Sequence, residues 1–235
     1  MPTNHLKRIA APNTWVIRRK ENKYITRPRC GPHSMRFSMA LSLVMRELVP
    51  VARTSSEAKK ILNTKDVFVD RRRRTDTKYP AGLMDIIEFP QLEEHYRMFL
   101  DAKGRLTALK ASAKEANLKL SRIESKTKLA GGKIQLNMFD GRNLRVDKDT
   151  YTVGDTLLLS LPDQKITEHF KLEKDALVLL TGGKHAGMTA KVEEINKNMI
   201  IVKSNKNQKF ETAKSYAFVI GKDKPALDSI KQTKA

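Results

Sequence analysis

Apolar residues recur at helical spacing in the first half of the chain. Between residues 39 and 49 they return roughly every three to four positions, and Pro50 stops the run. A second helix is expected at residues 55–62, where a capping hydroxyl begins the segment and Glu57 sits in the first turn, which the helix dipole favours. Residues 91–101 are expected to form one more short helix.

Elsewhere the hydrophobic period shortens towards two, which predicts β-strands. The clearest alternation runs through residues 133–139, and Asp140-Gly141 follows it directly as a strong hairpin signal. Gly154-Asp155 marks another turn. The expected strands are residues 67–70, 85–89, 119–128, 133–139, 144–146, 156–161, 166–170, 176–181, 189–195 and 199–203.

The order of these elements predicts an α+β, multi-domain chain. With 235 residues and 40% hydrophobic content, several modest cores are expected rather than one large core. The expected segments are a basic N-terminal extension (1–37), a small helix–helix–β domain (38–103), a central antiparallel β domain (104–170), a small β barrel (171–212) and a C-terminal segment (213–235).

Charge narrows the choice of partner. The chain has 46 Lys and Arg against 26 Asp and Glu, which gives a formal net charge of +20 and a pI of about 10.0. A domain pI above about 9 is typical of nucleic-acid-binding proteins. A polyanionic partner would relieve the self-repulsion, and DNA, RNA and an anionic membrane surface all meet that requirement.

Membrane insertion and disulfide scaffolds are not expected. The longest apolar runs, such as residues 177–180, fall far short of the roughly 18–20 residues that span a bilayer. The first residues hold no apolar stretch of signal-peptide length. The single cysteine, Cys30, excludes an intramolecular disulfide and suits a reducing cytoplasm.

The N-terminal 36 residues are expected to form an extended, largely coreless arm that is ordered against RNA or the protein body. Its expected local anchors are Trp15, Val16, Ile17, Tyr24 and Ile25. The arm holds nine Lys or Arg, the single acid Glu21, and four prolines. A disordered tail is the alternative, but disordered segments are poor in aromatic residues and this one contains Trp15. Trp15 is expected either to stack on RNA or to pack against the protein. The candidate RNA contacts here are Lys7, Arg8, Trp15, Arg18, Arg19, Lys20, Arg27, Arg29 and His33.

Four consecutive arginines follow the strand predicted at residues 67–70. Such a run cannot be buried, so it forms either a solvated loop or a phosphate clamp, and the high net charge favours the clamp. The candidates for phosphate contacts in this region are Arg71, Arg72, Arg73, Arg74 and Lys78, together with Arg142 at the central hairpin.

The glycine-rich loop at residues 182–187 does not match a nucleotide-hydrolysing P-loop. Met188-Thr189, rather than Lys-Ser or Lys-Thr, follows Gly187, and a strand follows instead of a helix. A strand, a basic glycine loop and a second strand resemble the KOW motif, which lies in a small SH3-like barrel. That resemblance implies RNA contacts by Lys184 and His185, with Gly187 at a position where a side chain would clash or strain the turn.

Residues 41–88 resemble the helix–helix–β RNA-binding domain of ribosomal protein four of the bacterial small subunit. The matching parts are Glu57-Ala58 before Ile61-Leu62, then Val67-x-Val69-Asp70, and Pro80 with Asp85-Ile86. That family usually shows Asn-Gly after its first strand and Gly-Asp before its second. Here Asp70-Arg71 and Gly82-Leu83-Met84-Asp85 stand there instead, which bears on its RNA contacts more than on its fold.

The N-terminus extends the resemblance to nearly the whole chain. The relevant N-terminal motifs are His5-Leu6-Lys7-Arg8, Ala11-Pro12, Trp15, Arg19-Lys20, Arg27-Pro28 and Gly31-Pro32-His33. With Asp140-Gly141-Arg142-Asn143 and Gly154-Asp155-Thr156 further along the chain, they resemble the archaeal and eukaryotic S-four-e family of small-subunit ribosomal proteins.

The S-four-e resemblance implies a structural protein of cytoplasmic ribosomes. Its partners would be small-subunit ribosomal RNA and neighbouring small-subunit ribosomal proteins. It implies no catalytic residues, no cofactor, no small-molecule substrate and no membrane partner.

A structural zinc site and two other functions are weighed against this interpretation. Cys30-x-x-His33 has zinc-ligand spacing, but a structural site needs four ligands and only His5 is a nearby third, so no metal is expected. A KOW-containing transcription elongation factor would bind RNA polymerase through the barrel alone. An RNA-modifying enzyme, or its accessory protein, would need a catalytic domain, for which small basic β modules leave little room.

Overall fold

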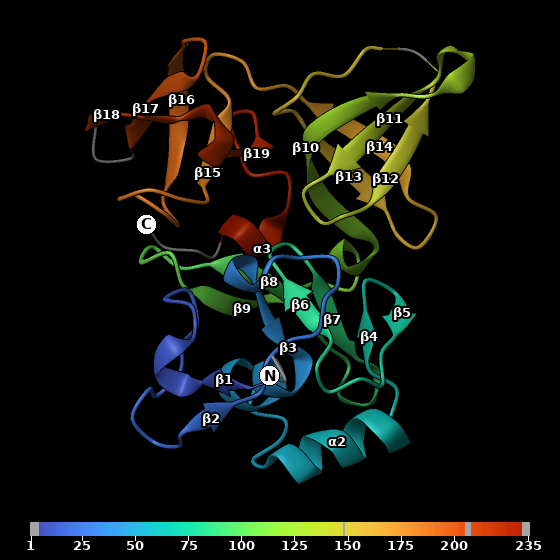
Figure 1. The fold of residues 1–235 in the computed structure, drawn as a ribbon. Coiled ribbons are helices and arrows are strands. Elements are labelled where there is room, and N and C mark those ends of the chain that lie inside the picture. The colour runs from blue at the N-terminus through green and yellow to red at the C-terminus, as the bar shows by residue number, and fades with distance from the viewer. Residues whose placement is uncertain (1–4, 148, 205–207, 232–235) are drawn as a thin grey trace. The chain divides into compact units, whose positions relative to one another are not determined.

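The computed structural model describes residues 5–147, 149–204 and 208–231 (Figure 1). It divides into two compact units: Met1–Phe99 with Arg105–Ala116, and Leu100–Gly104 with Asn117–Ala235. The units are built mostly from antiparallel strands with few helices, so the chain is a mixed α/β, multi-domain protein.

The N-terminal segment packs into the first unit. Strand β1 (Leu6–Lys7) pairs antiparallel with β2 (Tyr24–Ile25), with Leu6 opposite Ile25, and the short 3-10 turn η1 (Arg8–Ala10) follows β1. Leu6 and Ile25 are buried, and Trp15 is only 2% exposed. Trp15 and Ile25 are therefore the buried anchors that the sequence predicted, whereas Tyr24 is exposed, and a few apolar side chains are enough to order this segment.

Helices are short and confined mainly to the first unit. Strand β3 (Ser38–Ala40) pairs with β6 (Pro80–Gly82) before α1 (Leu41–Leu43) begins, and a π turn, η3 (Val44–Leu48), continues α1. The first predicted helix therefore starts later than its apolar pattern suggested.

Helix α2 (Ser55–Thr64) begins with reciprocal side-chain caps. The hydroxyl of Thr54 accepts a hydrogen bond from Glu57 N at 3.1 Å, and the Glu57 carboxylate accepts one from Arg53 N at 2.9 Å. The face carrying Ala58 and Leu62 is buried. The cap is thus Thr54, one residue before the hydroxyl expected from the sequence.

The main sheet of the first unit has the strand order β5-β4-β7-β8-β9. Its strands are β4 (Phe68–Val69), β5 (Arg72–Arg73), β7 (Ile86–Phe89), β8 (Glu94–Leu100) and β9 (Leu106–Ala111).

Strand β8 replaces the helix predicted at residues 91–101. The 3-10 turn η4 (Pro90–Leu92) and Glu93, at φ 53°, reverse the chain so that β8 pairs with β7, with Tyr96 opposite Ile87. Residues 96–100 are all buried, so both faces of the strand are covered. A short apolar run of this kind has no clear period, and length and neighbours decide between helix and strand.

The second unit begins with a five-stranded sheet in the order β12-β11-β10-β13-β14. Ile123, Leu136, Leu157 and Leu159 form the centre of its core. The hairpin turn lies at Asp140-Gly141, as predicted. Its strands are β10 (Leu118–Lys128), β11 (Ile134–Met138), β12 (Asn143–Val146), β13 (Thr156–Ser160) and β14 (Lys165–Phe170).

A second sheet in this unit has the order β18-β17-β16-β15-β19. It takes in β19, which lies beyond the expected barrel segment, and a short helix α3 (Asp228–Lys231) follows. The buried Arg122 of β10 joins the two sheets, because its guanidinium donates to the carbonyls of Ser215 and Ala217. Its strands are β15 (Leu177–Leu180), β16 (Thr189–Ile195), β17 (Met199–Ser204), β18 (Lys209–Ala213) and β19 (Ala217–Gly221).

Gly187 closes the loop between β15 and β16. Its φ is +87°, in the left-handed region, and its N–H donates to Leu180 O at 2.7 Å. A Cβ at this position would lie 1.8 Å from the backbone oxygen of Asp101, also in the second unit. Both backbone conformation and lack of space therefore require glycine here.

Gly187→Ala should destabilise the chain far more than Gly131→Ala. Gly131 has a similar φ of +79°, but nothing lies within 4 Å of its added Cβ. The left-handed conformation alone should cost about 1 kcal/mol in each variant, so the difference measures the clash with Asp101. Urea unfolding of both variants checks this, and equal losses would mean that the loop shifts freely.

Candidate RNA-binding surface

Two predicted RNA-binding arginines hold the N-terminal segment folded. Arg8 is buried, and its Nη1 donates to Arg18 O at 2.5 Å and lies 3.1 Å from Glu21 Oε2. The Arg19 guanidinium donates to three backbone carbonyls within residues 9–12 at 2.8–3.1 Å. These contacts satisfy backbone acceptors in a segment that has few strand partners.

Trp15 packs rather than presenting its ring to solvent. Its indole N–H donates to Ser38 O at 2.8 Å and lies 3.3 Å from Met35 O. With only 2% of its surface exposed, Trp15 has no free ring face on which a base could stack. Of the two roles expected from the sequence, the structure shows packing.

His33 is likewise an interior residue. Its side chain is fully buried, and Nε2 lies 2.8 Å from Asp85 Oδ1. The other oxygen of Asp85 accepts a hydrogen bond from Gly82 N at 2.8 Å. His33 therefore supports the turn before β7, and its predicted role in contacting RNA has no exposed surface to act through.

The remaining predicted cations of this segment face solvent. Arg18 pairs with Glu21 at 3.2 Å and Arg29 with Asp76 at 3.1 Å, but both pairs are exposed and such pairs contribute little. A phosphate could replace either carboxylate at small cost. The exposed candidates are Lys7, Arg18, Lys20, Arg27 and Arg29, and their RNA contacts stay predictions.

The first arginine of the run is tied to the protein. Asp70 and Arg71, at φ 51° and 62°, form the two-residue turn between β4 and β5. Arg71 Nη1 lies 2.8 Å from Oε2 of Glu88, whose side chain is 2% exposed. Burial raises the pKa of the Glu88 carboxyl above its ordinary value, and Arg71 offsets part of that rise.

The other three arginines differ in what they contact. Arg74 lies over the ring of Tyr79, with its guanidinium carbon 4.3 Å from the centroid. Arg73 pairs with the exposed Asp66 at 2.8 Å, while Arg72 is exposed on the edge strand β5. The predicted clamp is thus divided: Arg71 and Arg74 support the fold, and Arg72, Arg73 and the exposed Lys78 remain available to phosphates.

The predicted contacts of the second unit show the same division. Arg142 Nε lies 3.0 Å from Asp140 Oδ2, the atom that also contacts the buried Lys119 at 3.0 Å. The His185 ring stacks on Phe210, with centroids 4.0 Å apart. Gly187 is buried and His185 is partly buried, so Lys184 is the exposed one of the three candidates in the loop between β15 and β16.

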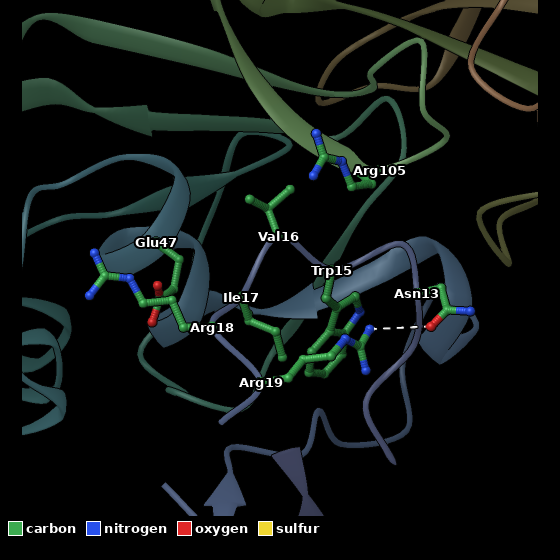
Figure 2. Close-up of a pocket in the computed structure, with 8 residues that line it drawn as sticks. All are labelled: Asn13, Trp15, Val16, Ile17, Arg18, Arg19, Glu47 and Arg105. Atoms are coloured by element: carbon green, nitrogen blue, oxygen red, sulfur yellow. Dashed lines mark hydrogen bonds between the residues drawn. The ribbon is translucent and has the colours of Figure 1, made fainter. Parts of the chain in front are cut away.

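Sequence reasoning missed Arg105. It lies just before β9, and with the N-terminal segment it lines a hollow of about 530 Å³ (Figure 2). The backbone bond from Leu106 N to Thr14 O, at 2.7 Å, brings the two segments together. Such a pairing between an irregular arm and a distant strand leaves no pattern in the sequence.

The described residues offer neither a metal centre nor a membrane span. Within them, no group of three or more His, Cys, Asp or Glu side chains could hold a metal ion. No helix among them is long and apolar enough to cross a bilayer.

The structure defines a strongly basic protein built from several small antiparallel β-sheets, and comparison with known families gives its assignment. The model of the ribosomal family S4e matches residues 92–166, and that of the RS4NT (NUC023) domain matches residues 2–36. The small ribosomal subunit protein eS4 of Methanococcus aeolicus is 41% identical over 96% of this chain and 97% of its own. That of Methanocaldococcus jannaschii is 40% identical over the same shares.

A solved structure agrees with this assignment. The crystal structure of the 30S ribosomal protein S4e from Thermoplasma acidophilum has a TM-score of 0.66 and 29% sequence identity, and the match covers 79% of this chain and 94% of that one. The chain belongs to the S4e family of ribosomal proteins, as its sequence motifs suggested.

Trp15→Phe should lower the free energy of unfolding by about 2–3 kcal/mol. The change leaves the Ser38 carbonyl without its donor and opens a small void in a buried site. Tyr24→Phe is the control, because Tyr24 is 49% exposed and should change stability by less than about 0.5 kcal/mol. Denaturant unfolding of both variants measures the two changes. Similarly small losses of unfolding free energy in both would refute the packing role of Trp15.

Arg71→Ala should lower the stability of the fold, whereas Arg72→Ala should affect only RNA binding. Arg71→Ala leaves the buried Glu88 carboxylate without its nearest cation and should cost about 2–3 kcal/mol. Arg72→Ala should leave stability unchanged but lower the salt slope of RNA binding by about one. Unfolding curves and salt titrations of both variants separate the two roles, and a stable Arg71→Ala protein would contradict this division.

The loss in Arg71→Ala should grow with pH. Without Arg71, the pKa of Glu88 in the folded state rises further above its unfolded value of about 4.3, so folding favours the protonated carboxyl. Stability should therefore fall as pH rises through that raised pKa. The deficit at about pH 8 should exceed that at about pH 5; a deficit independent of pH would exclude Glu88 as its source.

Proposed function

We propose that this chain is a structural constituent of the small ribosomal subunit and not an enzyme. The observation that carries the proposal is its similarity to eS4 proteins along 96% of its length. The expected partners are small-subunit ribosomal RNA and neighbouring ribosomal proteins, in cytoplasmic ribosomes. A net charge of +20 supports binding to a polyanion.

Phosphate contacts from exposed cations would supply most of the affinity. Each contact releases counterions and contributes little alone, so binding depends on many of them and weakens with salt. Proteins read A-form RNA by its shape, its 2′-hydroxyls and its looped-out bases. The exposed cations proposed for this role are Lys7, Arg18, Lys20, Arg27, Arg29, Arg72, Arg73, Lys78 and Lys184.

Several small modules in one chain would let separate RNA helices be held together. We retain as proposals the ribosomal-four-type domain at residues 38–103, the central β domain at 104–170 and a KOW barrel of SH3-like type at 171–212. The five antiparallel strands β15–β19 and the glycine loop between β15 and β16 support the barrel. Linked sites raise one another's effective concentration, which suits a protein that fixes folded RNA.

The two rival functions have less support. An elongation factor needs only the barrel, whereas the similarity to eS4 includes the N-terminal segment and the central sheet. An RNA-modifying enzyme needs catalytic groups converging in a pocket. Four of the buried carboxylates, Asp85, Glu88, Asp140 and Asp155, instead contact cations, histidines or backbone N–H groups.

Sedimentation of a cell lysate through a sucrose gradient tests the proposal directly. The protein, followed by antibody, should migrate with the small subunit at low salt and be released only at high salt, because its contacts are mainly ionic. Migration with RNA polymerase would favour the elongation factor. Migration as a free protein at low salt would refute the ribosomal assignment.

A further inference from the structure

The hollow in Figure 2 combines an apolar wall with basic edges. Val16 and Ile17 line it from the N-terminal segment, and both are partly exposed. Arg18 lines it from the same segment and Arg105 from the residue before β9. Its volume of about 530 Å³ lies within the range of ligand pockets, about 300–1,000 Å³.

The charge of this hollow suits an anion. The Arg18 side chain is 85% exposed, and its contact with Glu21 is an exposed pair that a phosphate could displace. Glu47 is the one carboxylate among the lining residues. Its Oε1 lies 3.9 Å from Arg8 Nη2 and 3.8 Å from Arg46 Nη2, so its negative charge is offset from both sides.

The wall of the hollow is held in place before any ligand arrives. Arg19 donates to the carbonyls of Ala11 and Pro12, and Arg8 donates to the carbonyl of Arg18. Trp15 anchors the same segment through the hydrogen bond that its indole N–H donates to Ser38 O. A site that is already ordered loses little conformational entropy on binding.

We propose that this hollow binds a single unstacked nucleotide of RNA. The base would pack against Val16 and Ile17, and Arg18 and Arg105 would contact its phosphate or stack on the base plane. Sequence-specific RNA recognition relies on splayed-out bases, for which Arg guanidinium planes are common stacking partners. This inference rests on the proposed function, since the nucleotide belongs to the bound RNA, but it adds a base-sized site to a set of phosphate contacts.

A pair of RNA hairpins tests the site in the full-length chain. One hairpin carries a single bulged 2-aminopurine and the other has the same 2-aminopurine paired within the stem. At salt high enough to weaken general phosphate binding, the bulged hairpin should bind about fivefold more tightly. Its fluorescence should also change on binding, because the environment of the extruded base changes.

Two variants and one charge-matched control identify where the bulge is recognised. Arg105→Gln and Val16→Asp should reduce the preference for the bulged hairpin to near unity, with folding checked by circular dichroism. Arg53→Gln removes the same charge as Arg105→Gln from an exposed residue that does not line the hollow. It should weaken both hairpins equally and keep the preference.

The possible failures are distinguishable. Equal binding of the two hairpins by the unaltered chain, or a preference that survives both variants, would overturn the nucleotide site and leave ribosomal binding intact. Loss of co-migration with the small subunit would instead overturn the proposed function. If a labelled polyglutamate peptide bound through Arg105 and no bulge preference existed, the hollow would be a site for an acidic protein segment.

Discussion

A buried carboxylate needs a hydrogen-bonding or charged partner, and this requirement shapes both the first unit and the central sheet β10–β14 of the second. Asp85, Glu88, Asp140 and Asp155 are each no more than 2% exposed. Their partners are His33, Arg71, the pair Lys119 and Arg142, and His169. An isolated buried charge would cost several kcal/mol, so these pairs make the local geometry close to obligatory.

Three of the four carboxylates, Asp85, Asp140 and Asp155, lie where the chain turns, and this helps modest cores to suffice. Asp155 receives hydrogen bonds from the backbone of Thr152 and Leu172 and contacts His169 at 2.7 Å. Burial alone would raise its pKa, but these hydrogen bonds lower the pKa by more, so that it stays below its ordinary value. One side chain thus fixes a turn and the end of β14 together. Small cores leave much of a fold to such polar contacts.

The same requirement divides the basic residues into two populations. Arg8 and Arg71 contact carboxylates, and Arg19 contacts backbone carbonyls. Lys20, Arg72 and Lys184 are exposed. In the sequence all of these look alike, since a run of arginines shows charge but not the partner that each one meets. Charge therefore predicted the class of ligand, while the contacts of individual residues depended on the tertiary structure.

Fold prediction succeeded where the signal was local. The Asp140-Gly141 turn lies in the predicted hairpin, because these residue types adopt the needed dihedral angles in almost any context. Residues 94–100 were misassigned because pairing with β7, a tertiary contact, decides their conformation. Strands β9 and β18 were not predicted for a related reason: their exposed or partly exposed positions, such as Lys110 and Glu211, weaken the apolar alternation.

The turn at Asp70-Arg71 shows how a departure from a family pattern can preserve a structure. The ribosomal-four-type family, which residues 41–88 resemble, usually has Asn-Gly at this turn, and that pair suits a two-residue turn with positive φ at both positions. Asp70 and Arg71 adopt the same φ signs at a cost of roughly 1–2 kcal/mol per non-glycine residue. Each then makes a contact that Asn-Gly would weaken or lose: Asp70 Oδ1 accepts from Ile86 N at 3.0 Å, and Arg71 pairs with Glu88. The strain is thereby offset by bonds that tie the turn to β7. For that reason the arginine run begins with a structural residue, and the exposed strand β5 carries the cations that follow it.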